Sequence, residues 1–525
     1  MEDLTTVVAP SRGISWQLRN NQKLVGATFL LSLIYWNFGY DGGIVSGFLA
    51  MAPFGNTFGS QKLPTGDHVL TPTDISVITA VPQVGNLLAI PFTAIGADRL
   101  GRKKMVHVAC AVSLIGAVLQ TAAYEKVMLV IGRTLGSMSI FLFLTLGTGW
   151  LAEVAPPELR GSFASLSITV IDFAAVVTAC ISRGTKDLPG SISYRIPIGL
   201  QLVWPLMISL GAFFVHDSPT FFLIKGKDDM AEESLRSIRG GYSDTEIYAE
   251  LDALRAQTSL RQAEADVAWN ELFKGTNRRR TLLSLSIANF QQLSGIAFAT
   301  NYATIFLMQV APGQDPFVLV IGLAILALGG AITGLLLVDR IGRRTLALGT
   351  FIPLFFINTV IGGLGFVNTT THPTVGKAIA AFSLMFGFFF AAGFGPLTYV
   401  VAGEMPTGRL RNKTTSFTFF TLISFATACQ YALPYLSQSN GANLGAKVYL
   451  IFSGWMLITI VTIYFCLPET KGRSPAELDE MFAAKVPARK FRTYVCGTAT
   501  SNFIAATTAK SGANVYHEET AAHKD

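Results

Sequence analysis

The stretch Asp98-Arg99-Leu100-Gly101-Arg102-Lys103 decides the fold, and the chain repeats it as Asp339-Arg340-Ile341-Gly342-Arg343-Arg344. Each copy follows one long apolar run and precedes another. A glycine turn that carries cations between two membrane-length segments is typical of a membrane surface. Similar offsets separate Glu153 from Glu404 and residues 216–219 from 467–470. One half of the chain is therefore a diverged copy of the other.

The composition is that of a membrane protein. Hydrophobic residues make up 50% of the 525 residues and charged residues 14%, whereas soluble proteins carry about 25% charged residues. The net charge of +7 does not indicate nucleic-acid binding, because the cations lie in short loops beside apolar runs. The cysteines show no metal or disulfide spacing, and packing is the expected role of the four in apolar runs: Cys110, Cys180, Cys429 and Cys466.

About twelve apolar segments reach the roughly 20 residues that a membrane-spanning helix needs. We expect them at 24–50, 74–97, 104–123, 127–150, 162–182, 197–215, 281–310, 317–338, 345–366, 376–402, 414–436 and 446–467. An even number places both chain ends on one side, and the positions of the Lys- and Arg-rich connections predict that this side is the cytoplasm. The sequence thus predicts an all-α membrane protein with an N-terminal segment (1–23), a six-helix half (24–215), a central loop (216–280), a second six-helix half (281–467) and a tail (468–525).

The central loop is expected to form short amphipathic helices beneath the bundle. Ser243 and Glu246 have the spacing of a capping box, and Ile247, Leu251 and Leu254 follow as one apolar stripe. Because the stripe is short, a plain linker between the halves is the alternative. The tail after Glu480 is polar, and we expect it to be disordered.

Several motifs in order along the chain resemble the sugar porter family of the major facilitator superfamily, in a fungal-type version. They are 38–43 (FGYDGG), the two turns at 98–103 and 339–344, Glu153 with Arg160, Glu404 with Arg409 and Arg411, 291–295 (QQLSG), Gly395-Pro396 and 468–472 (PETKG). The resemblance implies the major facilitator fold, with twelve transmembrane helices in two pseudo-symmetric halves. It also implies a monomeric, multi-pass protein of the plasma membrane. Such a protein carries a small-molecule substrate together with protons and needs no cofactor.

The sequence departs from that family where polar residues are expected to contact sugar. Ile168 and Ala297 stand where the family has Gln and Asn, and Tyr399 stands where it has Trp. Gln291 and Gln292 remain, with amide donors and acceptors that suit hydroxylated ligands. With Tyr399 and Asn301 they form the predicted substrate-binding set, although a single membrane Gln often only joins helices. Because fewer polar residues remain to contact sugar, the sequence favours a glycoside, a polyol or a bulkier, less hydroxylated solute over a plain hexose.

Three charged residues lie inside apolar segments and are the candidates for proton coupling. A charge in the bilayer is costly unless it is paired, so such groups indicate function. By resemblance, Asp41 and Arg133 face each other, and a proton would break the pair; a purely structural ion pair is the alternative. Asp172 has no counterpart in the family pattern, and it is expected either to line the cavity or to hydrogen bond to a neighbouring helix.

The loop charges are expected to form cytoplasmic ion-pair networks that part when the halves rock. Their members are Asp98, Arg99, Arg102, Glu153, Arg160, Asp217, Asp339, Arg340, Arg343, Glu404, Arg411 and Glu469. The alternative is that these arginines serve only orientation.

The function expected from these features is proton-coupled transport of a sugar-like solute by alternating access. A secondary-metabolite transporter or exporter of the same fold and a non-transporting nutrient sensor are the alternatives. An integral membrane enzyme is least favoured, since we find no nucleophile with a base and no metal spacing. Asn368 begins a glycosylation sequon in a connection expected outside, whereas the sequon at Asn412 is expected inside.

Overall fold

The computed structural model describes residues 22–154, 160–215, 217–265, 267–438 and 440–497. The first half contains α2 (Gln22–Leu49), α3 (Ala52–Phe58), β1 (Gln61–Lys62), β2 (His68–Val69), α4 (Pro72–Ala80), α5 (Gln83–Leu100), α6 (Arg102–Ala122), α7 (Lys126–Val154), α8 (Arg160–Thr185), α9 (Ile192–Gly199), η1 (Leu200–Leu202) and α10 (Val203–Phe213). The second contains α14 (Gly275–Gln292), α15 (Ile296–Ala299), α16 (Ala303–Val310), α17 (Pro316–Ile341), α18 (Arg343–Leu364), α19 (Pro373–Glu404), η3 (Gly408–Leu410), α20 (Arg411–Ser437), η4 (Gly445–Val448) and α21 (Tyr449–Cys466).

The helices correspond closely to the twelve expected segments. Within the described ranges, 10 helices are long and apolar enough to cross a membrane. The other two expected segments are α2 and the stretch 281–310. The latter was expected to be one span, and it is instead broken into α14, α15 and α16. Gly295 at the break has φ 95°, a left-handed conformation that does not continue a helix.

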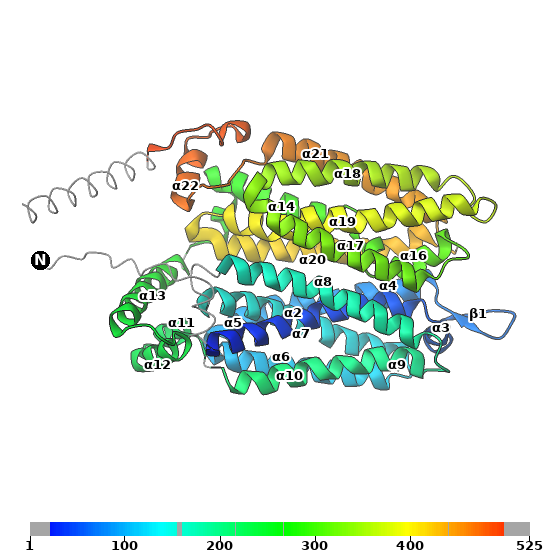
Figure 1. The fold of residues 1–525 in the computed structure, drawn as a ribbon, viewed down its shortest axis with the longest axis horizontal. Coiled ribbons are helices and arrows are strands. Elements are labelled where there is room, and N and C mark those ends of the chain that lie inside the picture. Colours follow the sequence, from blue (N-terminus) through cyan, green and yellow to red (C-terminus); the bar gives the residue numbers. More distant parts are fainter. Residues whose placement is uncertain (1–21, 155–159, 216, 266, 439, 498–525) are drawn as a thin grey trace, which may run out of the picture.

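The two halves lie side by side with their helices roughly parallel to one long direction (Figure 1). They meet where α8 packs on α17, α20 on α4 and α5, and α16 on α2. We call the end that carries the two arginine-rich turns and helices α11–α13 the basic end, and the end that carries the small β1–β2 hairpin the opposite end (Figure 1).

The two repeated turns have the same local structure. Gly101 and Gly342 adopt φ 89° and 94°, which connects α5 to α6 and α17 to α18 without a loop. A Cβ at Gly101 would lie 2.4 Å from an Asp217 carboxylate oxygen, and one at Gly342 would lie 2.5 Å from Glu469. Glycine is therefore required here both for the backbone conformation and for the close approach of a carboxylate.

The central loop folds as expected into α11 (Pro219–Ile224), α12 (Asp228–Ile238), α13 (Asp244–Ala265) and η2 (Trp269–Phe273). The predicted capping box is confirmed, because Glu246 accepts a hydrogen bond from the Ser243 amide at 2.8 Å and the Glu246 amide donates to Ser243 Oγ at 3.4 Å. Ile247 and Leu251 are buried against α12, with Leu254 packed beside them. The loop is thus a small helical layer at the basic end.

The expectation of a disordered tail after Glu480 is wrong as far as Gly497. Helix α22 (Pro475–Ala483) and η5 (Ala488–Lys490) pack at the basic end of the second half. Phe482 and Phe491 are 2% and 0% exposed, and their rings contact each other. Sequence reasoning weighted the polar composition and overlooked these aromatic anchors. Residues 498–525 lie outside the described part of the chain.

Candidate functional site

A cavity of about 450 Å³ lies between the two halves. Its lining comes from α2, α5, α7 and α8 on one side and from α14, α15, α17, α19 and α20 on the other. All seven residues predicted for proton coupling and substrate binding line it: Asp41, Arg133, Asp172, Gln291, Gln292, Asn301 and Tyr399. The packing therefore collects into one site residues that lie up to several hundred positions apart.

Asp41 and Arg133 face each other across the α2–α7 contact, as expected. Arg133 Nη2 lies 3.8 Å from Asp41 Oδ2, and their side chains are 5% and 15% exposed. Asp41 Oδ1 accepts a closer hydrogen bond of 2.8 Å from the Gln201 amide of η1. The Nε and Nη1 atoms of Arg133 have no hydrogen-bond partner among the described residues. The pair is therefore loose, and Arg133 holds unused donors beside the cavity.

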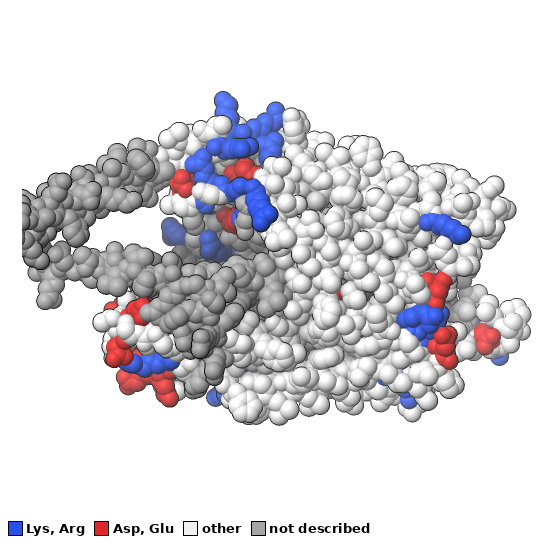
Figure 2. Space-filling model, viewed as in Figure 1, with Lys and Arg blue, Asp and Glu red and all other residues white. Residues whose placement is uncertain are grey.

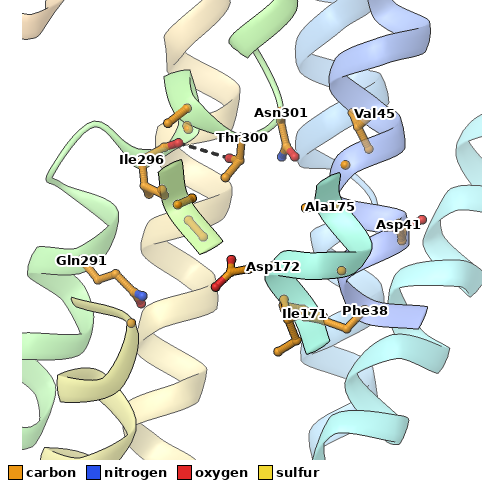
Figure 3. A pocket seen from close by; sticks show the side chains of 18 of the residues that line it. Phe38, Asp41, Val45, Ile171, Asp172, Ala175, Gln291, Ile296, Thr300 and Asn301 are labelled. Carbon is orange, nitrogen blue, oxygen red and sulfur yellow. Dashed lines mark hydrogen bonds between the residues drawn. The ribbon is translucent and has the colours of Figure 1, made fainter. Parts of the chain in front are cut away.

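Asp172 projects into the cavity from α8 toward α14, and its carboxylate and the Gln291 side chain point toward one another (Figure 3). Its position depends on the close packing of α8 on α2, where a Cβ on Gly39 would lie 2.1 Å from the Ile171 carbonyl oxygen. Asp172 makes no hydrogen bond or ion pair with another described residue, although it lies within electrostatic range of Tyr399. Of the two roles predicted for Asp172, the geometry favours the cavity over helix-to-helix bonding.

The break between α14 and α16 presents polar groups of the second half to the cavity. Gln291 and Gln292 end α14, and Asn301 lies between α15 and α16 (Figure 3). Tyr399 of α19 is 37% exposed and also lines the cavity. An unbroken helix would direct successive side chains around its axis, whereas the break lets several of them face one space.

The two apolar departures noted in the sequence also line the cavity. Ile168 lies on α8 and Ala297 on α15. Both positions therefore present carbon where the resembled family presents amide groups. The cavity wall at these points offers contact area without hydrogen bonds.

Sequence reasoning missed four further amide side chains at the site. Gln83 and Asn86 of α5 line the cavity, and Asn86 donates to Gln83 at 2.6 Å. Gln430 of α20 also lines the cavity. Gln201 of η1 donates its hydrogen bond to the Asp41 carboxylate. The available signal was a neutral amide inside an apolar run, which is weak because such groups often only join helices. In the described part of the chain, no cluster of three His, Cys, Asp or Glu could hold a metal ion.

The loop charges form two matching networks at the basic end. Arg102 pairs with Glu153 at 2.9 Å in the first half, and Arg343 pairs with Glu404 at 2.8 Å in the second. Asp217 accepts from the Arg102 amide at 3.0 Å, as Glu469 does from the Arg343 amide at 2.9 Å. None of these four contacts joins one half to the other.

Not every predicted member joins these networks. Arg99, Arg340 and Arg411 are exposed, and none of them forms an ion pair with a side chain that the structure describes. The side chains of Asp98, Arg160 and Asp339 lie outside the part of the chain that the structure describes.

The Asp217 carboxyl is buried, which raises its pKa, while hydrogen bonds from the backbone amides of Ser218, Lys103 and Arg102 oppose that rise.

Polar contacts near the opposite end join the two halves to each other. Ser46 and Thr304 hydroxyls lie 2.6 Å apart, as do those of Thr79 and Tyr302. Ser76 donates to the Tyr431 carbonyl at 2.8 Å. Because the two networks at the basic end do not join the halves, whereas these contacts do, the geometry is that of a bundle closed at the opposite end.

Known proteins resemble this chain over most of its length. The family model described as "Sugar (and other) transporter" matches residues 27–482. The high glucose sensor RGT2 of Saccharomyces cerevisiae is 28% identical over 476 residues, which cover 89% of this chain but only 61% of that protein. The major facilitator-type transporter ecdD of Aspergillus rugulosus is 29% identical, with 86% of each chain covered. The low-affinity glucose transporter HXT1 of S. cerevisiae is 27% identical, over 87% of this chain and 81% of that protein.

A solved structure shows the same fold. The xylose transporter XylE of E. coli, in a partially occluded inward-open conformation, superposes with a TM-score of 0.71 at 18% identity. The superposition covers 86% of this chain and 100% of XylE. Since the family model spans most of the chain and the helices form the expected two halves, this integral, multi-pass membrane protein belongs to the sugar transporter family of the major facilitator superfamily.

Proposed function

We propose that this protein transports a sugar or sugar-like small solute together with protons, by alternating access. The observation that carries the proposal is the shared cavity, where the amides of the second half and the Asp41–Arg133 pair of the first line one space. Relatives named as glucose transporters support the substrate class. The relatives named above are called transporters or, for RGT2, a sensor, which agrees with a function other than catalysis.

The cavity wall supports a substrate larger or less hydroxylated than a simple hexose. Gln291, Gln292 and Asn301 offer both donors and acceptors, while Ile168 and Ala297 offer only apolar surface. Tyr399 adds an aromatic face suited to packing on a sugar ring or an aglycone. A glycoside or polyol would use both kinds of surface.

Protons would couple to transport through Asp41. Protonation removes the charge that attracts Arg133, and the 3.8 Å contact leaves little else to hold the two together. Gln201 can still hydrogen bond to the neutral acid, so α2 would be released from α7 rather than from η1. Asp172 carries a second carboxylate in the same cavity, where it would meet either the substrate or the proton.

We further propose that the protein lies in the plasma membrane and acts as a monomer. Its basic end and both chain termini would face the cytoplasm. The cation-rich turns support this orientation through the positive-inside rule. In that orientation the opposite end is extracellular, and the described conformation is closed toward the outside.

Uptake of labelled solutes in a transport-deficient host tests the proposal. Hexoses, polyols and glycosides should be compared at an acidic and a neutral external pH. Concentrative uptake that increases in acid and collapses with a protonophore is expected for at least one solute. Saturable binding without flux would instead indicate a sensor, and outward flux in vesicles of known orientation would indicate an exporter.

A further inference from the structure

A cationic surface at the basic end, formed by the exposed side chains of Lys485, Arg489, Lys490 and Arg492, is not explained by transport. These are the only charged residues between Met481 and Gly497, so this stretch contains no acid. Figure 2 shows Lys and Arg gathered over α22 and the basic ends of α18 and α21. All four side chains are exposed.

The underlying chain holds this surface in a fixed shape. Phe482 and Phe491 are buried beneath it, and the Arg279 guanidinium lies over both rings at 5.4 and 6.0 Å. Arg473 donates to the carbonyls of Phe491 at 3.0 Å and Tyr494 at 2.7 Å. The cations therefore project from an ordered turn.

The surface lies at the level where α21 leaves the membrane. Arg489 lies over the rings of Tyr464 and Phe465, at 4.2 and 4.7 Å, in the last turn of that helix. Those two side chains are 45% and 59% exposed and continue the exposed apolar face that includes Leu457 and Val461. A guanidinium stacked on lipid-facing aromatic rings must lie in the headgroup layer.

Nearby acids do not neutralise the surface, because each is engaged elsewhere. Glu477 caps α22 through the Ser474 amide at 2.7 Å and pairs with Arg473 at 3.3 Å. Asp479 pairs with Arg280, and Glu480 accepts from the Gly497 amide at 2.7 Å. None of the four exposed cations forms an ion pair with a side chain that the structure describes, so their charge is left free to attract anions.

We propose that this surface binds the phosphate groups of anionic phospholipids in the leaflet that the basic end faces. Lys and Arg are each attracted to an anionic membrane surface strongly enough to change affinity roughly fivefold. Binding would fasten the tail to the bilayer beside α21 while the second half rocks. The proposal is independent of which substrate the protein carries.

The test uses the full-length protein in detergent micelles, with the melting temperature measured against added phosphatidylserine or phosphatidylcholine. Phosphatidylserine should raise the melting temperature, and phosphatidylcholine should not. Arg489→Gln/Lys490→Gln should need at least tenfold more phosphatidylserine for the same rise, whereas the charge-keeping variant Arg489→Lys/Lys490→Arg should respond like the wild type.

Lys225→Gln/Lys227→Gln is the matched control, since both lysines are exposed at the basic end but belong to the α11–α12 connection. This variant should respond to phosphatidylserine like the wild type. An equal response of the Arg489→Gln/Lys490→Gln variant and the wild type would overturn the proposal. So would an equal rise with inorganic phosphate at the same phosphate concentration, because it would indicate a site for free anions.

Discussion

Lys186 Nζ lies 2.8 Å from Asp315 Oδ2, a contact that fastens α8 of the first half to the N-terminus of α17 in the second. Arg183 Nε lies 2.8 Å from the same oxygen. The three side chains form an ionic clamp near the opposite end. A bundle that alternates its access must break this clamp in every cycle.

Neutralising Asp315 should make that end open more readily. Thr300 lines the cavity and can report on its access. In a cysteine-free background, Asp315→Asn should increase labelling of Thr300→Cys by an impermeant maleimide about fivefold, because a partly exposed pair contributes about 1 kcal/mol. Asp187→Asn is the control, since Asp187 is 78% exposed and contacts Arg183 within α8 and its following turn. Equal labelling in the two variants would argue against a clamp.

The clamp should also respond to strong acid. Burial raises the pKa of Asp315, but hydrogen bonds from Lys186 and the Phe317 amide and the nearby charges of Lys186 and Arg183 outweigh it, so the pKa lies below its usual range. When the clamp opens, the Asp315 carboxyl loses these partners and its pKa rises back into the ordinary range of an aspartate. The clamp is therefore complete at neutral pH and is lost as the pH falls through that range and below it.

Labelling of Thr300→Cys, normalised to unfolded protein at the same pH, should therefore be flat down to about pH 5 and rise below about pH 4. Asp315→Asn should not show this rise, since the titrating group is gone. Asp187 is the other acid that contacts Arg183, and the control variant Asp187→Asn tests whether its titration contributes to the rise.

Removing either cavity glutamine should weaken substrate binding. Gln291→Ala and Gln292→Ala each leave ligand polar groups unpaired, at a cost of about 1–3 kcal/mol, which corresponds to roughly 5- to 150-fold in apparent affinity. Initial uptake rates against substrate concentration measure this. Asn289→Ala on the same helix is the control, because Asn289 hydrogen bonds to Thr421 and is not in the cavity lining.

Adding an amide at the apolar wall should shift selectivity. Ala297→Asn places a donor and an acceptor in the cavity, so uptake of simple hexoses should rise relative to glycosides. Competition by unlabelled hexose against the best substrate gives the ratio. An unchanged substrate profile would mean that this position does not contact the ligand.

Asp41→Asn should uncouple transport from protons, because it keeps the shape of the side chain but fixes it without charge. The variant should still exchange substrate but lose concentrative uptake. Each proton that moves through the membrane potential supplies about 2.3 kcal/mol per 100 mV, and the variant could no longer use this energy. Arg133→Ala should have the same effect, since it removes the cation whose attraction to Asp41 is the interaction that a proton would otherwise break. Accumulation by Asp41→Asn that still collapses with a protonophore would move the coupling site to Asp172.

Asp172→Asn separates the remaining roles of that carboxylate. If Asp172 only held a neighbouring helix, the amide would serve equally well. Because the carboxylate faces the cavity, we expect the variant to lose affinity or coupling while its melting temperature stays within a few degrees of the wild type. Wild-type kinetics in Asp172→Asn would exclude both roles in transport.

The sequons test the orientation. Asn368 is exposed in the connection between α18 and α19, and Asn412 is exposed at the start of α20, at the basic end. Glycosidase should shift the mobility of the wild type and of Asn412→Gln, but not of Asn368→Gln. A glycan on Asn412 would reverse the proposed orientation.

The sequence by itself determined the features that depend on neighbouring residues. Membrane-length apolar runs, the glycine turns at Gly101 and Gly342 and the capping box at Ser243 follow from local pattern, and the structure contains each of them. The paired copies of the turn also determined that the chain has two related halves. The tail was misjudged because Phe482 and Phe491 anchor it through contacts that composition does not reveal.

Tertiary structure alone decided how these elements meet. Asp41, Arg133 and Gln201 lie on three separate elements, and their distances depend on how α2, α7 and η1 pack. The clamp of Lys186 and Asp315 likewise exists only in the conformation that is closed at that end. Periodicity determines which face of a helix is apolar, but the neighbour of that face depends on packing between segments far apart in the chain, which no local pattern encodes.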